Sequence, residues 1–145
     1  FRDKHIVPIL EANVRAYIYA NTKKKISKCL FKDIWVVRQF RDEYNPVHYH
    51  SGHISGVGYL KVPDDLGQAS QKSKISNPNG QLEIIHGAKM FLSEANIRIT
   101  PKVGDFYMFP HYTMHNVYPF KSSGERRSIS FNAEIDENIA NVYSG

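Results

Sequence analysis

The sequence predicts a mainly β domain preceded by one helix, and three observations lead to that prediction. The chain has 145 residues, of which 41% are hydrophobic and 12% aromatic, enough for one domain with a sizeable core. Residues 8–22 carry apolar side chains at helical spacing. From residue 29 onward, short runs rich in β-branched and aromatic residues alternate with Gly, Pro, Asn and Asp. We therefore expect a single domain over residues 1–145, with a helical flank at 1–28 and a β core at 29–135.

The elements follow from local patterns. A helix is expected to begin near Pro8, because proline fits a first helical turn, and its expected face comprises Ile9, Leu10, Asn13, Val14, Tyr17 and Ile18. Asn45-Pro46 is expected to break regular structure, and Pro110 to end a strand. The polar stretch 63–80 is long for a connection and is expected to be a lid over a site or a disordered insertion. Strands are expected at residues 29–40, 55–62, 81–86, 96–100, 105–109, 115–120 and 127–135.

Charge and composition narrow the class of partner. The formal net charge is +5, and part of the excess lies in one lysine run that a solvated turn explains, so nucleic acid is not the expected partner. No apolar stretch reaches membrane-spanning length and no signal peptide is recognisable, which predicts a soluble, cytoplasmic protein. The single cysteine, Cys29, is expected to be a buried apolar residue, because it cannot form an internal disulfide.

Histidines in two distant segments indicate a metal site. His48 and His50 are one residue apart, so on an extended chain their side chains point to the same side and can hold one ion. His115 is expected at the start of a later strand and would add a third nitrogen, leaving metal positions open as an oxygenase requires. The glycines that follow His50 are expected to let backbone approach whatever the histidines hold.

Other histidines offer alternatives. His53 could replace one member of the pair if the segment bends, and His111 could swing inward from its loop. His5 and His86 are interpreted as ordinary surface or core residues.

Arg126 is the candidate anion-binding residue. It lies 126 − 115 = 11 residues after the third histidine and could hold a carboxylate by a two-pronged hydrogen bond. Strand alternation puts its side chain in one polar row with Ser128, Ser130 and Asn132. Arg127 shares the opposite row with apolar Ile129 and Phe131, which makes it the weaker candidate.

These residues resemble the motifs of a known family. The run that includes His115, Val117, Pro119, Phe120, Gly124, Arg126 and Ser128 resembles the distal half of the 2-oxoglutarate- and iron(II)-dependent dioxygenases. The proximal half, His48-Tyr49-His50 followed by SGVGYL, is similar to the family's H-x-D motif and its following strand. The resemblance covers roughly residues 35–135, and it extends to a subgroup of bacteria and tailed phages with SGV-Y and R-x-SISFN motifs.

The resemblance implies a double-stranded β-helix, or jelly roll. It implies that His48, His50 and His115 are catalytic ligands of Fe(II), and that Arg126 and Ser128 bind the co-substrate 2-oxoglutarate with help from Tyr59. One residue departs from the family pattern, because His50 stands where the family has a carboxylate. Other sources of a carboxylate would be Asp42, Glu43, Asp64 or Asp65.

Three functions compete at this level. The first is an active dioxygenase that hydroxylates a prime substrate. The second is a non-catalytic jelly-roll module of a phage virion, with assembly partners or a second copy of the chain as its contacts. The third is a three-histidine cupin enzyme, which is disfavoured because no glutamate follows the His-x-His pair.

Overall fold

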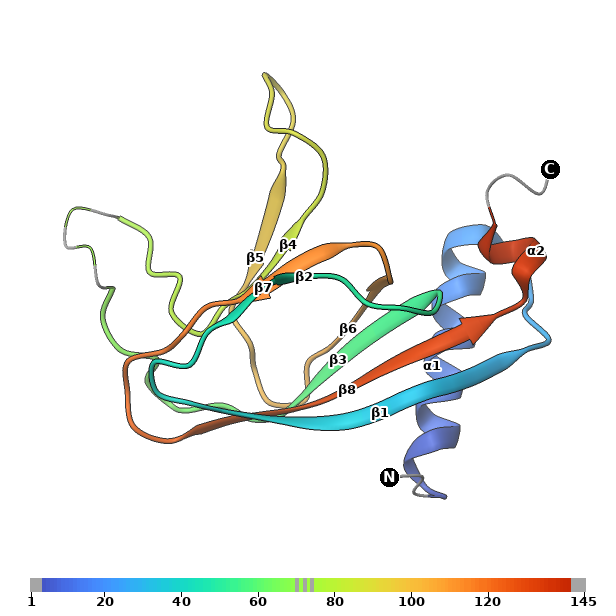
Figure 1. Cartoon of the computed structure of the whole chain (residues 1–145), viewed down its shortest axis with the longest axis horizontal. Helices are drawn as coiled ribbons and strands as arrows, with labels where there is room; N and C mark the ends of the chain where they lie inside the picture. The colour runs from blue at the N-terminus through green and yellow to red at the C-terminus, as the bar shows by residue number, and fades with distance from the viewer. Residues whose placement is uncertain (1–3, 70, 72, 74, 142–145) are drawn as a thin grey trace.

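The computed structural model describes residues 4–69, 71, 73 and 75–141. Two four-stranded antiparallel sheets face each other in it, with one long helix beside them (Figure 1). The strand order is β1-β8-β3-β6 in the first sheet and β2-β7-β4-β5 in the second. Eight strands in two facing sheets form a jelly roll, so the predicted fold class is confirmed. The elements are α1 (Ile6–Thr22), β1 (Cys29–Phe40), β2 (Asn45–His48), β3 (Ile54–Lys61), β4 (Leu82–Ile85), β5 (Asn96–Ile99), β6 (Phe106–Pro110), β7 (Met114–Val117), β8 (Glu125–Ile135) and α2 (Glu137–Ala140).

The long central strand β8 organises the first sheet. It pairs with β1 along nearly its whole length and with β3 on its other side, where Ser128 lies opposite Tyr59. Because its side chains alternate, one face carries Arg126, Ser128 and Ser130 into the space between the sheets. The other face carries Ile129 and Phe131 into the apolar core. The predicted polar and apolar rows are therefore confirmed.

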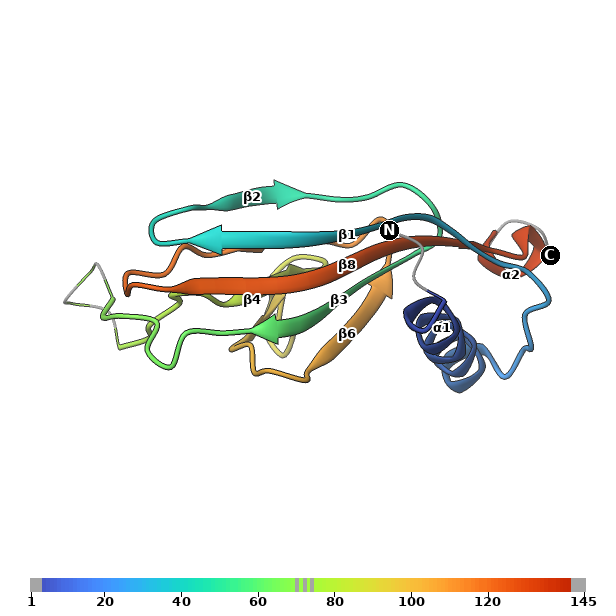
Figure 2. The same ribbon diagram turned by 90° about the horizontal axis from the view of Figure 1, so that it is seen from below.

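Helix α1 lies against the outer face of this sheet at one end (Figure 2). Its buried side chains are Leu10, Val14 and Ile18, which recur every four residues and pack in one cluster with Phe131 and Ile135. Ile9, predicted on the same face, is 60% exposed, so the buried stripe is narrower than expected. Among the described residues, no helix has the length and apolar character needed to cross a membrane.

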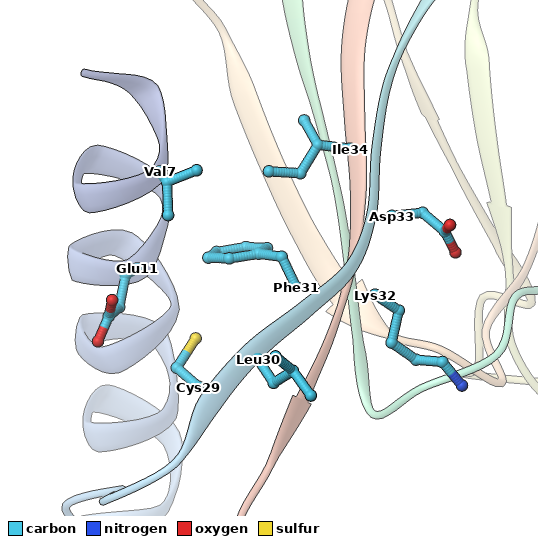
Figure 3. Close-up of a pocket in the computed structure, with 8 residues that line it drawn as sticks. All are labelled: Val7, Glu11, Cys29, Leu30, Phe31, Lys32, Asp33 and Ile34. Carbon is cyan, nitrogen blue, oxygen red and sulfur yellow. The ribbon is translucent and has the colours of Figure 1, made fainter. Parts of the chain in front are cut away.

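The contact between α1 and β1 is incomplete at one end, where a hollow of about 350 Å³ remains (Figure 3). Phe31 points toward the helix there, whereas Lys32 and Asp33 point away from it. Cys29 lines this hollow and is half-buried, and burial raises the pKa of its thiol to about 11. The cysteine is therefore protonated and unreactive at neutral pH.

One local expectation was wrong. Asn45-Pro46 does not break regular structure, because both residues belong to β2. A proline is tolerated there since β2 is an edge strand whose pairing with β7 is irregular between Asn45 and His48. The glycines of β3 make room for aromatic rings on one face, and Gly56 also lines the cavity between the sheets. A Cβ on Gly56 would lie 2.3 Å from the Phe131 ring, and one on Gly58 would lie 2.6 Å from the Phe106 ring.

Within the polar stretch 63–80, Asp65, Leu66 and Gly80 contact the loop that joins β7 to β8. The Lys121 amide donates to the Leu66 carbonyl, and the Asn79 side chain donates to carbonyls within the stretch itself. No described residue of the stretch lines the cavity between the sheets. At the end of the stretch, the Gly80 carbonyl accepts a hydrogen bond from Arg126.

Candidate functional site

Three histidines from different parts of the chain meet between the two sheets. His48 ends β2, His115 lies opposite it in β7, and His50 follows two residues after β2. One ring nitrogen of each lies within 4.8 Å of the others, and His50 Nε2 is 3.2 Å from His115 Nε2. The set predicted from the sequence is the set that the structure brings together.

Backbone contacts orient these rings. The Nδ1–H of His48 donates to the Pro46 carbonyl at 2.6 Å, and the Nδ1–H of His115 donates to the Thr113 carbonyl at 2.9 Å. With the proton held on Nδ1, each ring presents the Nε2 lone pair to the centre of the cluster. A carbonyl that holds the far N–H of a histidine is the usual support of a metal ligand.

His50 is positioned differently, because the regular strand ends before it. Its backbone amide donates to the His111 carbonyl, and the His111 amide donates in turn to the His53 carbonyl. Trp35 of β1 lies beside it, with ring centroids 5.7 Å apart. The loop after β2 thus turns the His50 ring toward the other two.

Burial favours the uncharged form of His115 and His50. It lowers the pKa of His115 to about 4, against the opposing effect of the Thr113 carbonyl, and the neighbouring histidines lower it further. Burial and then His48 also lower the pKa of His50. Neutral imidazoles are the form that binds metal ions.

The alternative ligands lie elsewhere. The Ile135 amide donates to His53 Nδ1, and His53 Nε2 is 3.4 Å from a Glu137 carboxylate oxygen, so this ring is occupied at the end of β8. Asp42 pairs with Lys121, and Glu43 accepts a hydrogen bond from the Phe40 amide. In the described part of the chain, the group around His48 contains histidines only.

The histidines open on a cavity of about 120 Å³ between the sheets. Its lining is apolar on the β6 and β7 side, through Phe109 and Val117, and polar along β8. Ser55 also lines it, and its hydroxyl donates a hydrogen bond of 2.9 Å to the Asn132 side chain. The residues lining the cavity are Trp35, Val37, Asn45, His48, His50, Ser55, Gly56, Val57, Tyr59, Leu82, Phe109, His115, Val117, Arg126, Ser128 and Ser130.

Arg126 provides the positive charge of the cavity. It is 3% exposed, one Nη donates to the Gly80 carbonyl at 3.0 Å, and its Nε–H has no hydrogen-bond partner. Its guanidinium carbon lies 5.7 Å from the centroid of the Tyr59 ring. The Tyr59 hydroxyl is also buried without a partner, and burial raises its pKa to about 12. Two buried donors without acceptors at one cavity wall fit an anionic ligand.

Comparison with known proteins agrees with this geometry. Residues 33–132, which are 100 of the 145 residues, match the family model described as "Putative 2OG-Fe(II) oxygenase". The chain belongs to the 2OG-Fe(II) oxygenase family. This membership implies Fe(II) and 2-oxoglutarate as cofactor and co-substrate, and the histidine cluster has the donors to hold the ion.

Solved structures share the fold. The structure of a 2OG-Fe(II) oxygenase family oxidoreductase from Burkholderia pseudomallei is 13% identical, with a TM-score of 0.62 over 89% of this chain and 56% of that one. A Pseudomonas putida prolyl-4-hydroxylase is 14% identical, with a TM-score of 0.55 over 87% of this chain and 63% of that one. This chain therefore spans less than two thirds of the length of these structures. No curated protein matches it in sequence.

Some residues of the cavity wall lie outside the sequence motifs. Trp35, Asn45 and Leu82 line the cavity, yet no motif marks them. The signal for Trp35 was its alternation with Val37 on β1, which predicts a shared face once that face is known to be the inner one.

Proposed function

We propose that the chain is a 2-oxoglutarate-dependent iron dioxygenase that hydroxylates a C–H bond of its prime substrate. The observation that carries the proposal is the pairing, in one cavity, of three convergent imidazole nitrogens with a buried, unpaired arginine. Bound iron(II) would supply the centre at which dioxygen is activated, while 2-oxoglutarate is converted to succinate and carbon dioxide and one oxygen atom enters the substrate.

The protein's own groups have separate tasks in this reaction. His48, His50 and His115 hold the ion through their ring nitrogens. Arg126 binds the far carboxylate of 2-oxoglutarate with its free Nε–H, in a charge-assisted hydrogen bond. Tyr59 donates from its unpaired hydroxyl, and Ser128 adds a hydroxyl on the same wall. The apolar wall of Phe109 and Val117 limits the water that reaches the ion.

We also propose that residues 1–145 act as one domain. The packing of Leu10, Val14 and Ile18 against the outer face of the first sheet supports this, because removing α1 would expose the core around Phe131. We assign the activity to the cytoplasm.

The test compares two neighbouring arginines. Arg126→Ala should weaken 2-oxoglutarate binding at least tenfold and reduce the formation of succinate, while leaving metal affinity unchanged. Arg127→Ala is the matched control, since Arg127 lies on the opposite face, pairs with Glu125 and has a side chain that is 41% exposed. Isothermal titration of both variants with 2-oxoglutarate gives the binding constants. Equal binding by Arg126→Ala and Arg127→Ala would refute the role of Arg126.

A non-catalytic jelly-roll module, for example of a virion, is the second candidate. The observation that favours it is His50, because a three-histidine set lacks the carboxylate of the oxygenase triad. The iron-loaded protein separates the two functions when it is given 2-oxoglutarate and oxygen. A module would bind metal yet form no succinate above the level without protein, whereas the oxygenase forms succinate even without its prime substrate.

A further inference from the structure

The two sheets meet without strand pairing where β1 faces β2. Each is the edge strand of its sheet, because β1 pairs with β8 and β2 pairs with β7, and no pairing joins β1 to β2 in the described part of the chain. From the turn at 41–44 the two strands run into different sheets (Figure 1). Their facing edges are unpaired, so side chains close the space between the sheets here.

A groove of about 480 Å³ opens to the outside at this place. This side groove is lined by residues 37–39 of β1, residues 43–45 and Arg126. Val37, Asn45 and Arg126 line both the side groove and the cavity between the sheets. The groove and the cavity are therefore separated by the side chains of these three residues.

Of the three, Asn45 is the residue that can move most easily. Arg126 is held by the Gly80 carbonyl and lies against the Tyr59 ring. Val37 lies inside β1, opposite Ser128 of β8. Asn45 is exposed, begins β2 where the pairing with β7 is irregular, and its side chain makes no hydrogen bond among the described residues. An exposed side chain without such ties changes rotamer within nanoseconds.

The inner end of the side groove contains polar groups that are not satisfied. Gln39 lies directly opposite Arg126 in the register of β1 and β8 and is 5% exposed. Its Nε2 donates to the Glu43 carbonyl, whereas its Oε1 is buried without a partner. The Nε–H of Arg126 is likewise buried without an acceptor. A buried donor and a buried acceptor left unpaired on neighbouring strands are typical of a place that water or a polar ligand enters.

Charge directs anions through the side groove toward Arg126. The outer lining carries one charge of each sign, Arg38 and Glu43, which offset each other at a distance. Arg126 forms no ion pair within the described part of the chain, so the inner end of the groove keeps an unbalanced positive charge. A carboxylate is therefore attracted to Arg126 from this side without first passing the histidines.

Resting on the Arg126 site of the proposed function, we propose that the side groove is a second entrance to the cavity, through which 2-oxoglutarate reaches Arg126 and succinate leaves, with the Asn45 side chain as its gate. The opposite end, where His48 and His50 are partly exposed, then serves the prime substrate. The co-substrate exchanges while the prime substrate is bound, and the two bind in random order.

The test places a removable obstacle in the side groove. Asn45→Cys, made together with Cys29→Ser, is labelled with a bulky methanethiosulfonate reagent, and a reductant later removes the label. The iron-loaded protein is kept under nitrogen, where bound 2-oxoglutarate is not consumed, and the release of radiolabelled 2-oxoglutarate into an excess of the unlabelled compound is timed. The label should slow release roughly tenfold or more, and its removal should restore the rate. The dissociation constant should change by less than about threefold, because a gate slows entry and exit alike.

Tyr112→Cys in the same background is the matched control. Tyr112 is 68% exposed in the loop between β6 and β7, so its label lies at the histidine end and should leave the release rate unchanged. If Asn45→Cys does not fold, Tyr44→Cys replaces it, since Tyr44 lines the same groove and is 51% exposed.

Three results would overturn the second entrance. They are an unchanged release rate with the groove labelled, a label at residue 112 that slows release as much as the groove label, and a loss of affinity without slower release, which would mean that the label disturbs the bound ligand. Absence of 2-oxoglutarate binding to the unlabelled wild type would instead refute the proposed function itself.

Discussion

Glu83 links β4 to its neighbours β5 and β7, and His115 lies in β7. Neutralising the Glu83 carboxylate should weaken these links. It lies in β4, is 6% exposed and accepts four hydrogen bonds, from Asn96 at 2.5 Å, Arg98 at 2.8 Å, Asn116 at 2.8 Å and Tyr118 at 2.9 Å. Burial alone would raise the pKa of its carboxyl, but these donors outweigh it and lower the pKa to about 2 from an ordinary 4.5.

The shift sets the size and the sign of the effect. A difference of 2.5 pKa units, at 1.36 kcal/mol per unit, corresponds to about 3 kcal/mol of folding stability. Because the folded pKa is the lower one, this stability is fully present above pH 4.5 and is lost as the pH falls toward 2. At pH 3 about 1 kcal/mol should remain. Glu83→Gln should therefore lower Tm by roughly 6–12 °C at pH 7 and by much less at pH 3.

Thermal unfolding followed by circular dichroism at both pH values measures the effect. Glu94→Gln is the control, because Glu94 is an exposed carboxylate on the same hairpin and its loss should leave Tm nearly unchanged. A Glu83→Gln variant that melts within about 2 °C of the wild type at pH 7 contradicts the reasoning. So does a Tm difference that is as large at pH 3 as at pH 7.

Two further predictions concern the core and the metal. Gly56→Ala should destabilise the protein by about 1–3 kcal/mol in urea unfolding, because the new Cβ would meet the Phe131 ring at 2.3 Å; unchanged stability would show that the ring moves aside freely. Trp35 is the only tryptophan and lies beside His50, so cobalt(II) should quench its fluorescence, and EDTA should restore it. His115→Ala should raise the cobalt(II) concentration needed for half-maximal quenching at least tenfold. An unchanged concentration in the variant would place the ion elsewhere.

Local patterns predicted much of the fold and the site. The period of two along β8 predicted that Arg126 and Ser128 share a face, and the structure lines the cavity with both. The spacing of His48 and His50 predicted convergence, although the strand ends at His48 and a loop contact between His50 and His111 orients the second ring. The pattern did not predict the aromatic rings that pack where Gly56 and Gly58 lack side chains, because a sequence shows the missing side chain but not the ring that fills its place.

The sequence by itself determined the strands, the helix and the residue types that can bind a metal and an anion, because these depend on side-chain chemistry and on short-range periodicity. Only the tertiary structure decided which of seven histidines converge, because His48 and His115 meet through the pairing of β2 with β7, 67 residues apart along the chain (115 − 48). It also decided that the cavity contains no carboxylate. The residues that face one another across the cavity come from both sheets, so the balance of charge inside it follows from the tertiary structure.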